Sequence, residues 1–100
     1  MKYDKLIRDK IPEIIKQNGG APMIHIAHDK EYWQKLKEKL REEADEFMEN
    51  GDASEIVDIL EVLDAICEYK NFDRAELLTL KNKKAEERGG FKERIILEES

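Results

Sequence analysis

Two stretches of helical hydrophobic periodicity, separated only by Gly51 and Asp52, constrain the fold of this chain more than any other feature. In both stretches the apolar residues recur at three- and four-residue intervals, which is the spacing of one helix face. Gly51-Asp52 has the composition of a tight turn, so we expect an antiparallel helical hairpin. Its apolar positions are Trp33, Leu36, Leu40, Ala44 and Phe47 on the first arm, and Ile56, Ile59, Leu60, Leu63, Ile66 and Cys67 on the second.

Helix-boundary signals place the remaining elements around this hairpin. Pro12 suits a first helical turn that begins near Asp9 or Lys10, and glycines at 19 and 20 end that helix. Residues 23–27 alternate like a short strand, whose partner would be residues 94–97. Asp29 is the expected N-terminal cap of the first arm, Asp52 with Glu55 forms a capping box for the second arm, and Asp73 with Glu76 does so for the last helix. The first arm should end near Asn50, and the last helix should end near Arg88, before Gly89-Gly90.

These signals predict one all-α domain over residues 1–100, an antiparallel helical bundle with a small two-stranded ribbon beside it. The chain has a single cysteine and no apolar run of signal-peptide or membrane-spanning length, so we expect a cytoplasmic protein without a membrane partner. Because its pI is near 5.0, we expect no nucleic-acid partner. Because charged residues make up 42%, a homodimer or higher homo-oligomer would help to bury the helix faces.

Charge is segregated within the hairpin. Residues 42–65 contain ten carboxylates and no lysine or arginine, so this segment carries −10 in a chain whose net charge is −6, and the flanks together carry +4. A solvated acidic face is the ordinary explanation for such a run. The complete absence of bases, and the position of Glu43 within the apolar stripe, favour a site for hard cations instead.

The helical spacing indicates which carboxylates converge. At about 100° per residue, Glu43 and Glu46 lie on one side of the first arm, and Glu55 and Asp58 lie on the corresponding side of the second. Folding the hairpin at residues 51 and 52 brings the two pairs of carboxylates to about the same position along the hairpin axis. Two carboxylates about 5 Å apart repel by roughly 3 kcal/mol at an effective dielectric constant of 20, so a convergent group favours a bound cation. Mg²⁺, with Mn²⁺ as an alternative, suits such oxygen ligands and also accepts substrate phosphate.

Four segments resemble the all-α NTP pyrophosphatase (MazG) superfamily. Glu42-Glu43-Ala44-Asp45-Glu46 and Glu55-Ile56-Val57-Asp58 are similar to its EExxE and ExxD motifs, and the segments 3–12 and 83–91 are similar to its phosphoribosyl-ATP pyrophosphohydrolase-like branch. The resemblance implies Mg²⁺-dependent cleavage of nucleoside triphosphates to monophosphate and pyrophosphate, as house-cleaning of non-canonical nucleotides. It implies metal ligands at Glu43, Glu46, Glu55 and Asp58, with Glu42 as a ligand or a supporting group.

Two features of the site stay open at this point. The interval between Glu46 and Glu55 is shorter than is usual in the superfamily, and Glu61 with Asp64 also forms an ExxD pair at a more usual interval. The direction in which the side chains face favours Glu55 and Asp58, which we prefer, whereas the interval favours the pair Glu61 and Asp64. Glu61 is therefore kept as a further candidate metal ligand. A carboxylate not fully committed to metal could accept a proton from water, and Glu42, Glu43 and Glu46 are the candidates.

Basic flanks supply the groups that would hold phosphate: Lys5, Arg8, Lys10, Lys84 and Arg88. The guanidinium groups of the two arginines match phosphate best. Other hypotheses compatible with the sequence are a phosphoribosyl-ATP pyrophosphatase of histidine biosynthesis, a non-enzymatic acidic helical adaptor that dimerises, and an inactive relative that senses nucleotides.

Overall fold

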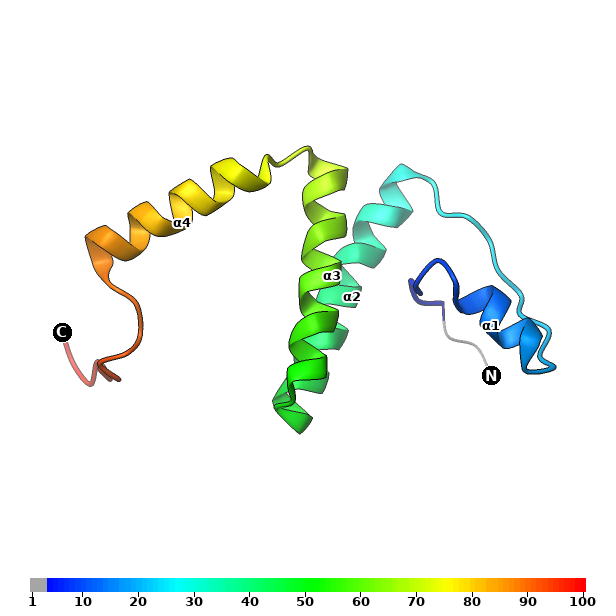
Figure 1. Cartoon of the computed structure of the whole chain (residues 1–100), viewed down its shortest axis with the longest axis horizontal. Helices are drawn as coiled ribbons and strands as arrows, with labels where there is room; N and C mark the ends of the chain where they lie inside the picture. Colours follow the sequence, from blue (N-terminus) through cyan, green and yellow to red (C-terminus); the bar gives the residue numbers. More distant parts are fainter. Residues whose placement is uncertain (1–3) are drawn as a thin grey trace.

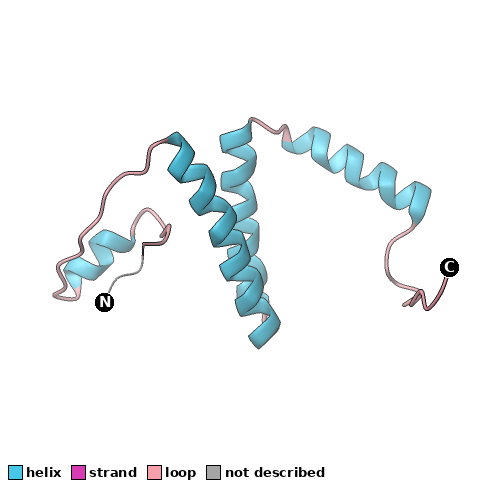
Figure 2. Ribbon diagram, turned by 180° about the vertical axis from the view of Figure 1, so that it is seen from behind, coloured by secondary structure: helices cyan, strands magenta, loops and turns pink. Residues whose placement is uncertain are grey.

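The computed structural model describes residues 4–100, and every regular element in that range is an α-helix (Figures 1 and 2). The four helices are α1 (Ile11–Gln17), α2 (Asp29–Asn50), α3 (Ala53–Lys70) and α4 (Arg74–Arg88). The predicted all-α class and the central acidic hairpin, formed by α2 and α3, are confirmed. Tyr3, which belongs to the N-terminal segment of the family resemblance, lies outside the described residues.

The hairpin turns tightly between α2 and α3. Gly51 ends α2 in the left-handed conformation, with φ of +67°, which a residue without a side chain adopts at little cost. Leu36 of α2 and Val62 of α3 are the buried hydrophobic residues of the described chain, and α2 and α3 are in contact along the hairpin. The hairpin is therefore held by a short apolar seam.

Aromatic residues close the open end of the hairpin. The Trp33 ring stacks on the Tyr69 ring at a centroid distance of 5.6 Å, and the Tyr69 hydroxyl donates a hydrogen bond to the Asp29 carbonyl at 3.2 Å. These contacts join the start of α2 to the end of α3. Because Trp33 already stacks on a side chain of its own hairpin, its structural role is the one that the apolar stripe predicted.

The outer helices extend away from the hairpin, so the molecule is elongated, with dimensions of 55 × 31 × 24 Å (Figure 1). Pro12 lies in the first turn of α1, as expected. The Asp73 side chain caps α4 by accepting hydrogen bonds from the backbone N–H groups of Ala75 and Glu76. α4 contains no buried residue, and Figure 2 shows it as a separate arm.

Three local predictions are wrong. His28, not Asp29, caps α2, and its Nδ1 accepts the Glu31 N–H at 3.2 Å. Asp52 does precede α3, but its side chain makes no capping hydrogen bond. The ribbon between residues 23–27 and 94–97 does not form, because the two segments lie at opposite ends of the molecule and neither is a strand (Figure 1). A two-stranded pair without a covering element is marginal in any case.

The apolar stripe of α3 is also divided in a way that the periodicity did not predict. Ile59 and Ile66 are half-buried on the side of Val62, whereas Ile56, Leu60 and Leu63 are 42%, 52% and 38% exposed. α3 is thus apolar on two sides, and α2 covers one of them. None of the helices within residues 4–100 has the length and apolar character needed to cross a membrane.

Candidate metal centre

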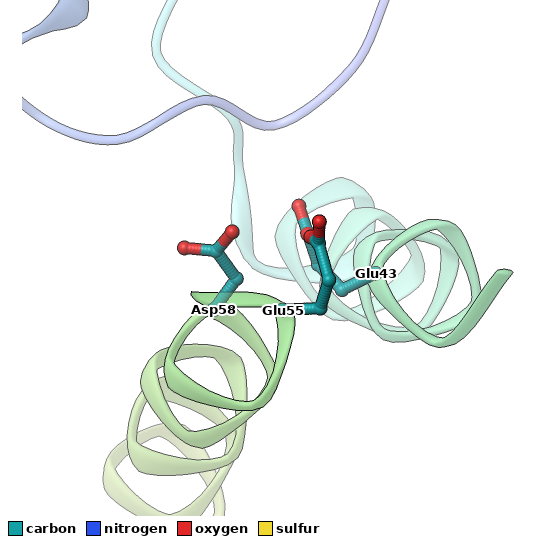
Figure 3. Close-up of side chains that lie close together, drawn as sticks. All are labelled: Glu43, Glu55 and Asp58. Atoms are coloured by element: carbon teal, nitrogen blue, oxygen red, sulfur yellow. The ribbon is translucent and has the colours of Figure 1, made fainter. Parts of the chain in front are cut away.

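Three carboxylates from the two arms of the hairpin meet on one face. Glu43 comes from the middle of α2, and Glu55 and Asp58 come from the first turns of α3. One oxygen atom of each lies within 4.8 Å of the others, and Figure 3 shows the Glu43 and Glu55 side chains projecting in the same direction beside Asp58. The predicted Glu46 is exposed and does not belong to this cluster.

The local sequence explains the convergence. Glu55 and Asp58 are three residues apart, so they lie on neighbouring positions of one helix face. The turn at Gly51 then folds α3 back along α2, which brings that face level with Glu43. Glu55 is further held by a hydrogen bond from the Asn50 side-chain amide at 3.1 Å, so the end of α2 also orients a residue of α3.

Glu43 is the central residue of the cluster because it is buried. Its exposed fraction is 7%, and Lys39, one turn earlier, contacts its Oε1 at 3.2 Å. Its Oε2 is buried and has no hydrogen-bond partner within the described part of the chain. An unsatisfied buried oxygen of an ionised carboxylate costs free energy, and a cation at the mouth of the cluster would remove that cost.

A segment of irregular chain before α1 brings two predicted basic residues to the hairpin. Arg8 Nη2 donates to Asp58 Oδ1 at 2.8 Å, and Lys5 Nζ donates to Glu42 Oε1 at 3.1 Å. Lys35 of α2 anchors this segment by donating to the Asp4 carbonyl at 2.6 Å. The segment and α2 enclose an open hollow whose walls include Lys5, Lys35 and Lys39. Asp4, Glu38 and Glu42 line the same hollow, so a hollow of mixed charge lies beside the acidic cluster.

Lys39 was not predicted as a site residue. It contacts both Glu42, at 3.2 Å, and Glu43, and its side chain is 16% exposed. The signal was present in the sequence, because positions 39, 42 and 43 have the i, i+3 and i, i+4 spacings of helical ion pairs. Lys39 lies three residues before the segment 42–65, so the absence of bases within that segment does not reveal it.

The charges around the cluster shift three pKa values. Burial alone would raise the pKa of Glu42, but hydrogen bonds from Lys5 and Lys39 outweigh it and lower that pKa. Burial would lower the pKa of Lys39, but hydrogen bonds to Glu43 and Glu42 raise it. The pKa of Glu46 is raised, chiefly by the negative charge of Glu43 and further by burial and by Glu55. The negative charges of the cluster therefore favour the protonated form of Glu46.

The other predicted residues lie elsewhere. Glu61 is exposed and outside the cluster, and Asp64 forms an ion pair with Arg74 at the start of α4. Lys10 is an exposed residue at the start of α1. Lys84 and Arg88 are exposed on α4, which extends away from the hairpin (Figure 1). Within residues 4–100 the structure therefore joins Glu43, Glu55, Asp58 and Arg8, with Glu42 and Lys5 beside them.

Comparison with known proteins assigns no activity. The chain matches no family model and no solved structure. An uncharacterized protein of Mycolicibacterium smegmatis is 48% identical over 42 residues, which are 42% of this chain and 43% of that protein. The chain thus spans less than half the length of this relative, whose description states no function.

Proposed function

We propose that this chain is a Mg²⁺-dependent nucleoside-triphosphate pyrophosphohydrolase, which uses water to convert a nucleoside triphosphate to the monophosphate and pyrophosphate. The observation that carries the proposal is the buried Glu43, whose Oε2 lacks a hydrogen-bond partner among the described residues and lies beside Glu55 and Asp58. The resemblance of the acidic motifs to the MazG superfamily supports the same reaction. House-cleaning of non-canonical nucleotides is the role that this resemblance favours.

The donor set fits a hard divalent cation. All three converging groups are carboxylates, which are the protein ligands that Mg²⁺ and Mn²⁺ prefer, and Glu55 and Asp58 are partly exposed. Glu43, Glu55 and Asp58 would hold the ion, and their open side leaves positions for water and phosphate. When bound, Mg²⁺ supplies Lewis acidity that neutralises phosphate charge and makes a coordinated water more acidic.

The N-terminal segment supplies the phosphate-binding groups of the proposal. Arg8 already lies at the cluster through its ion pair with Asp58, and its planar guanidinium can donate two hydrogen bonds to a phosphate group. Lys5 and Lys39 lie on the same face, where they pair with Glu42, and each would exchange that carboxylate for a phosphate oxygen. A polyphosphate would therefore lie between these bases and the acidic cluster.

Among the three candidate bases, we propose that Glu46 accepts a proton from water. Glu42 is engaged by two ammonium groups, which favour its ionised form and make it a weaker base. Glu43 is buried against Lys39. Glu46 is exposed, and its raised pKa makes it a better proton acceptor at neutral pH than an ordinary surface glutamate.

The test is release of pyrophosphate from a panel of ordinary and modified nucleoside triphosphates in the presence of Mg²⁺. Wild type should release pyrophosphate, Glu43→Gln should lose about a hundredfold or more of kcat/KM, and Glu68→Gln, an exposed control on α3, should match wild type. Activity confined to phosphoribosyl-ATP would instead identify the histidine-pathway enzyme. Nucleotide binding without turnover would identify a sensor. A chain that neither binds nor cleaves a nucleoside triphosphate or phosphoribosyl-ATP would contradict the proposal.

A further inference from the structure

A neighbouring side chain engages one oxygen atom of each carboxylate in the metal centre. The three pairs are Lys39 with Glu43 Oε1, Asn50 with Glu55 Oε1, and Arg8 with Asp58 Oδ1. Two of these donors are cations, whereas the amide of Asn50 is neutral. Asn50 can therefore be removed without changing the charge of the cluster, and any effect of its removal on the site comes from the position of Glu55.

The hydrogen bond from Asn50 spans the turn of the hairpin. Asn50 is the last residue of α2, and Glu55 lies in the first turn of α3 on the other side of Gly51. The sequence predicted a capping box of Asp52 with Glu55, but the Asp52 side chain makes no capping hydrogen bond. Glu55 instead accepts the Asn50 amide at 3.1 Å, so its carboxylate is held by the helix that also carries Glu43.

This arrangement limits how each glutamate can bind an ion. A glutamate whose first oxygen is held by a donor offers the second oxygen to a cation, and so acts as a single-oxygen ligand. Glu43 has the same character, because Lys39 contacts its Oε1 and its buried Oε2 has no hydrogen-bond partner among the described residues. Figure 3 shows the Glu43 and Glu55 side chains projecting in the same direction.

Mg²⁺ and Ca²⁺ need different things from such a group. Mg²⁺ requires nearly ideal octahedral geometry at about 2.0–2.1 Å and keeps several waters, which suits a few single oxygens beside an open face. Ca²⁺ takes roughly six to eight oxygens at about 2.3–2.6 Å and often binds a carboxylate through both of its oxygens. A carboxylate that is free to turn both oxygens towards the ion therefore favours Ca²⁺.

We propose that Asn50 is a positioning residue that gives the metal centre a preference for Mg²⁺ over Ca²⁺, because it holds Glu55 as a single-oxygen ligand. The inference rests on the proposed function in one respect, since it requires that Glu43, Glu55 and Asp58 bind a cation. Groups that orient metal ligands change metal affinity by about 10- to 100-fold when they are removed. Without the amide, Glu55 loses its fixed orientation for Mg²⁺ and gains the two-oxygen mode that Ca²⁺ uses.

The experiment is isothermal titration calorimetry of the full chain with Mg²⁺ and with Ca²⁺, without nucleotide. Asn50→Ala should raise the Kd for Mg²⁺ by about tenfold or more and that for Ca²⁺ by less than about threefold, so the preference for Mg²⁺ should fall at least about threefold. Asn50→Asp keeps the shape of the side chain but lacks the N–H donor, and it should lower the same preference.

The matched control is Gln34→Ala. Gln34 also donates an amide hydrogen bond to a carboxylate, that of Glu38 at 3.1 Å, but both residues are exposed on α2 and lie outside the cluster. Its removal should leave both dissociation constants within about twofold of wild type. The comparison shows whether the loss of any such hydrogen bond alters the response to ions.

The ratio of the two dissociation constants separates positioning from a loss of order, because a less ordered hairpin would weaken binding of both ions alike. Unchanged constants in Asn50→Ala, or equal weakening for both ions, would overturn this inference and leave the metal centre in place. A wild-type chain that binds neither ion would overturn the inference and the proposed function together. If Asn50→Ala does not fold, the ratio measured for Asn50→Asp decides.

Discussion

Removal of the Arg8 guanidinium should change the affinities for cation and for nucleotide in opposite directions. In the structure Arg8 pairs with Asp58, one of the three carboxylates of the metal centre, at 2.8 Å. A cation that uses Asp58 must compete with this arginine. A phosphate group on the bound cation offers Arg8 a new partner, so the same residue opposes binding of the free ion and favours binding of the ion with substrate.

The magnitudes follow from the exposure of the pair. The Arg8 and Asp58 side chains are 52% and 37% exposed, so the ion pair is a surface pair worth about 0.2–1 kcal/mol. Arg8→Gln should therefore tighten binding of Mn²⁺ alone by roughly 1.5- to 5-fold. A hydrogen bond between charged groups is worth about 1.5–3 kcal/mol, so the same variant should raise the KM for a nucleoside triphosphate by about 10- to 100-fold.

Isothermal titration calorimetry with Mn²⁺ measures the first effect, and steady-state kinetics of pyrophosphate release measures the second. Arg41→Gln is the matched control, since it removes the same charge from an exposed position on α2 and should change neither value by more than about twofold. If Arg8→Gln weakens binding of the free ion, or leaves the KM unchanged, Arg8 does not exchange Asp58 for phosphate.

Two other substitutions test the ligand assignment and the electrostatics. Glu55→Gln should weaken Mn²⁺ binding by about tenfold or more and Glu61→Gln by less than about twofold, as measured by calorimetry. The reverse ranking would move the site by nearly two turns along α3. Because Glu43 raises the pKa of Glu46 above its ordinary value of 4.5, ionised Glu46 destabilises the metal-free fold, and that penalty disappears below pH 4.5. Glu46→Gln should therefore raise the Tm at pH 7 but not below pH 4.5, and a gain that is the same at both pH values would rule out this explanation.

The hairpin could be predicted from the sequence because its signals are local. The apolar spacing of α2 and the glycine at its end depend only on neighbouring residues, and the turn then fixes the register of Glu43 against Glu55 and Asp58. Rotation of α3 was less well determined. Apolar residues occupy two sides of that helix, so periodicity alone could not show that Val62, rather than Leu63, would be buried.

Contacts between segments that are far apart in the sequence could not be predicted from local signals. Arg8 reaches Asp58 because an irregular segment crosses the hairpin, and nothing in the local sequence fixes the path of such a segment. α4 contains no buried residue, so its apolar pattern could not indicate where Lys84 and Arg88 lie relative to the hairpin. The predicted ribbon failed for a related reason, since alternation identifies a strand pattern but not a partner within reach.

The most direct test of the metal centre is the response of the purified chain to Mn²⁺ in wild type and Glu43→Gln, without nucleotide. For wild type we expect saturable Mn²⁺ binding and a Tm that rises with the ion, since a ligand at 100 times its Kd stabilises the fold by about 2.7 kcal/mol. In Glu43→Gln the buried carboxylate is replaced by a neutral amide of the same shape, so the rise in Tm should be largely lost. Equal rises in wild type and the variant would contradict the assignment of Glu43, Glu55 and Asp58 as a metal centre.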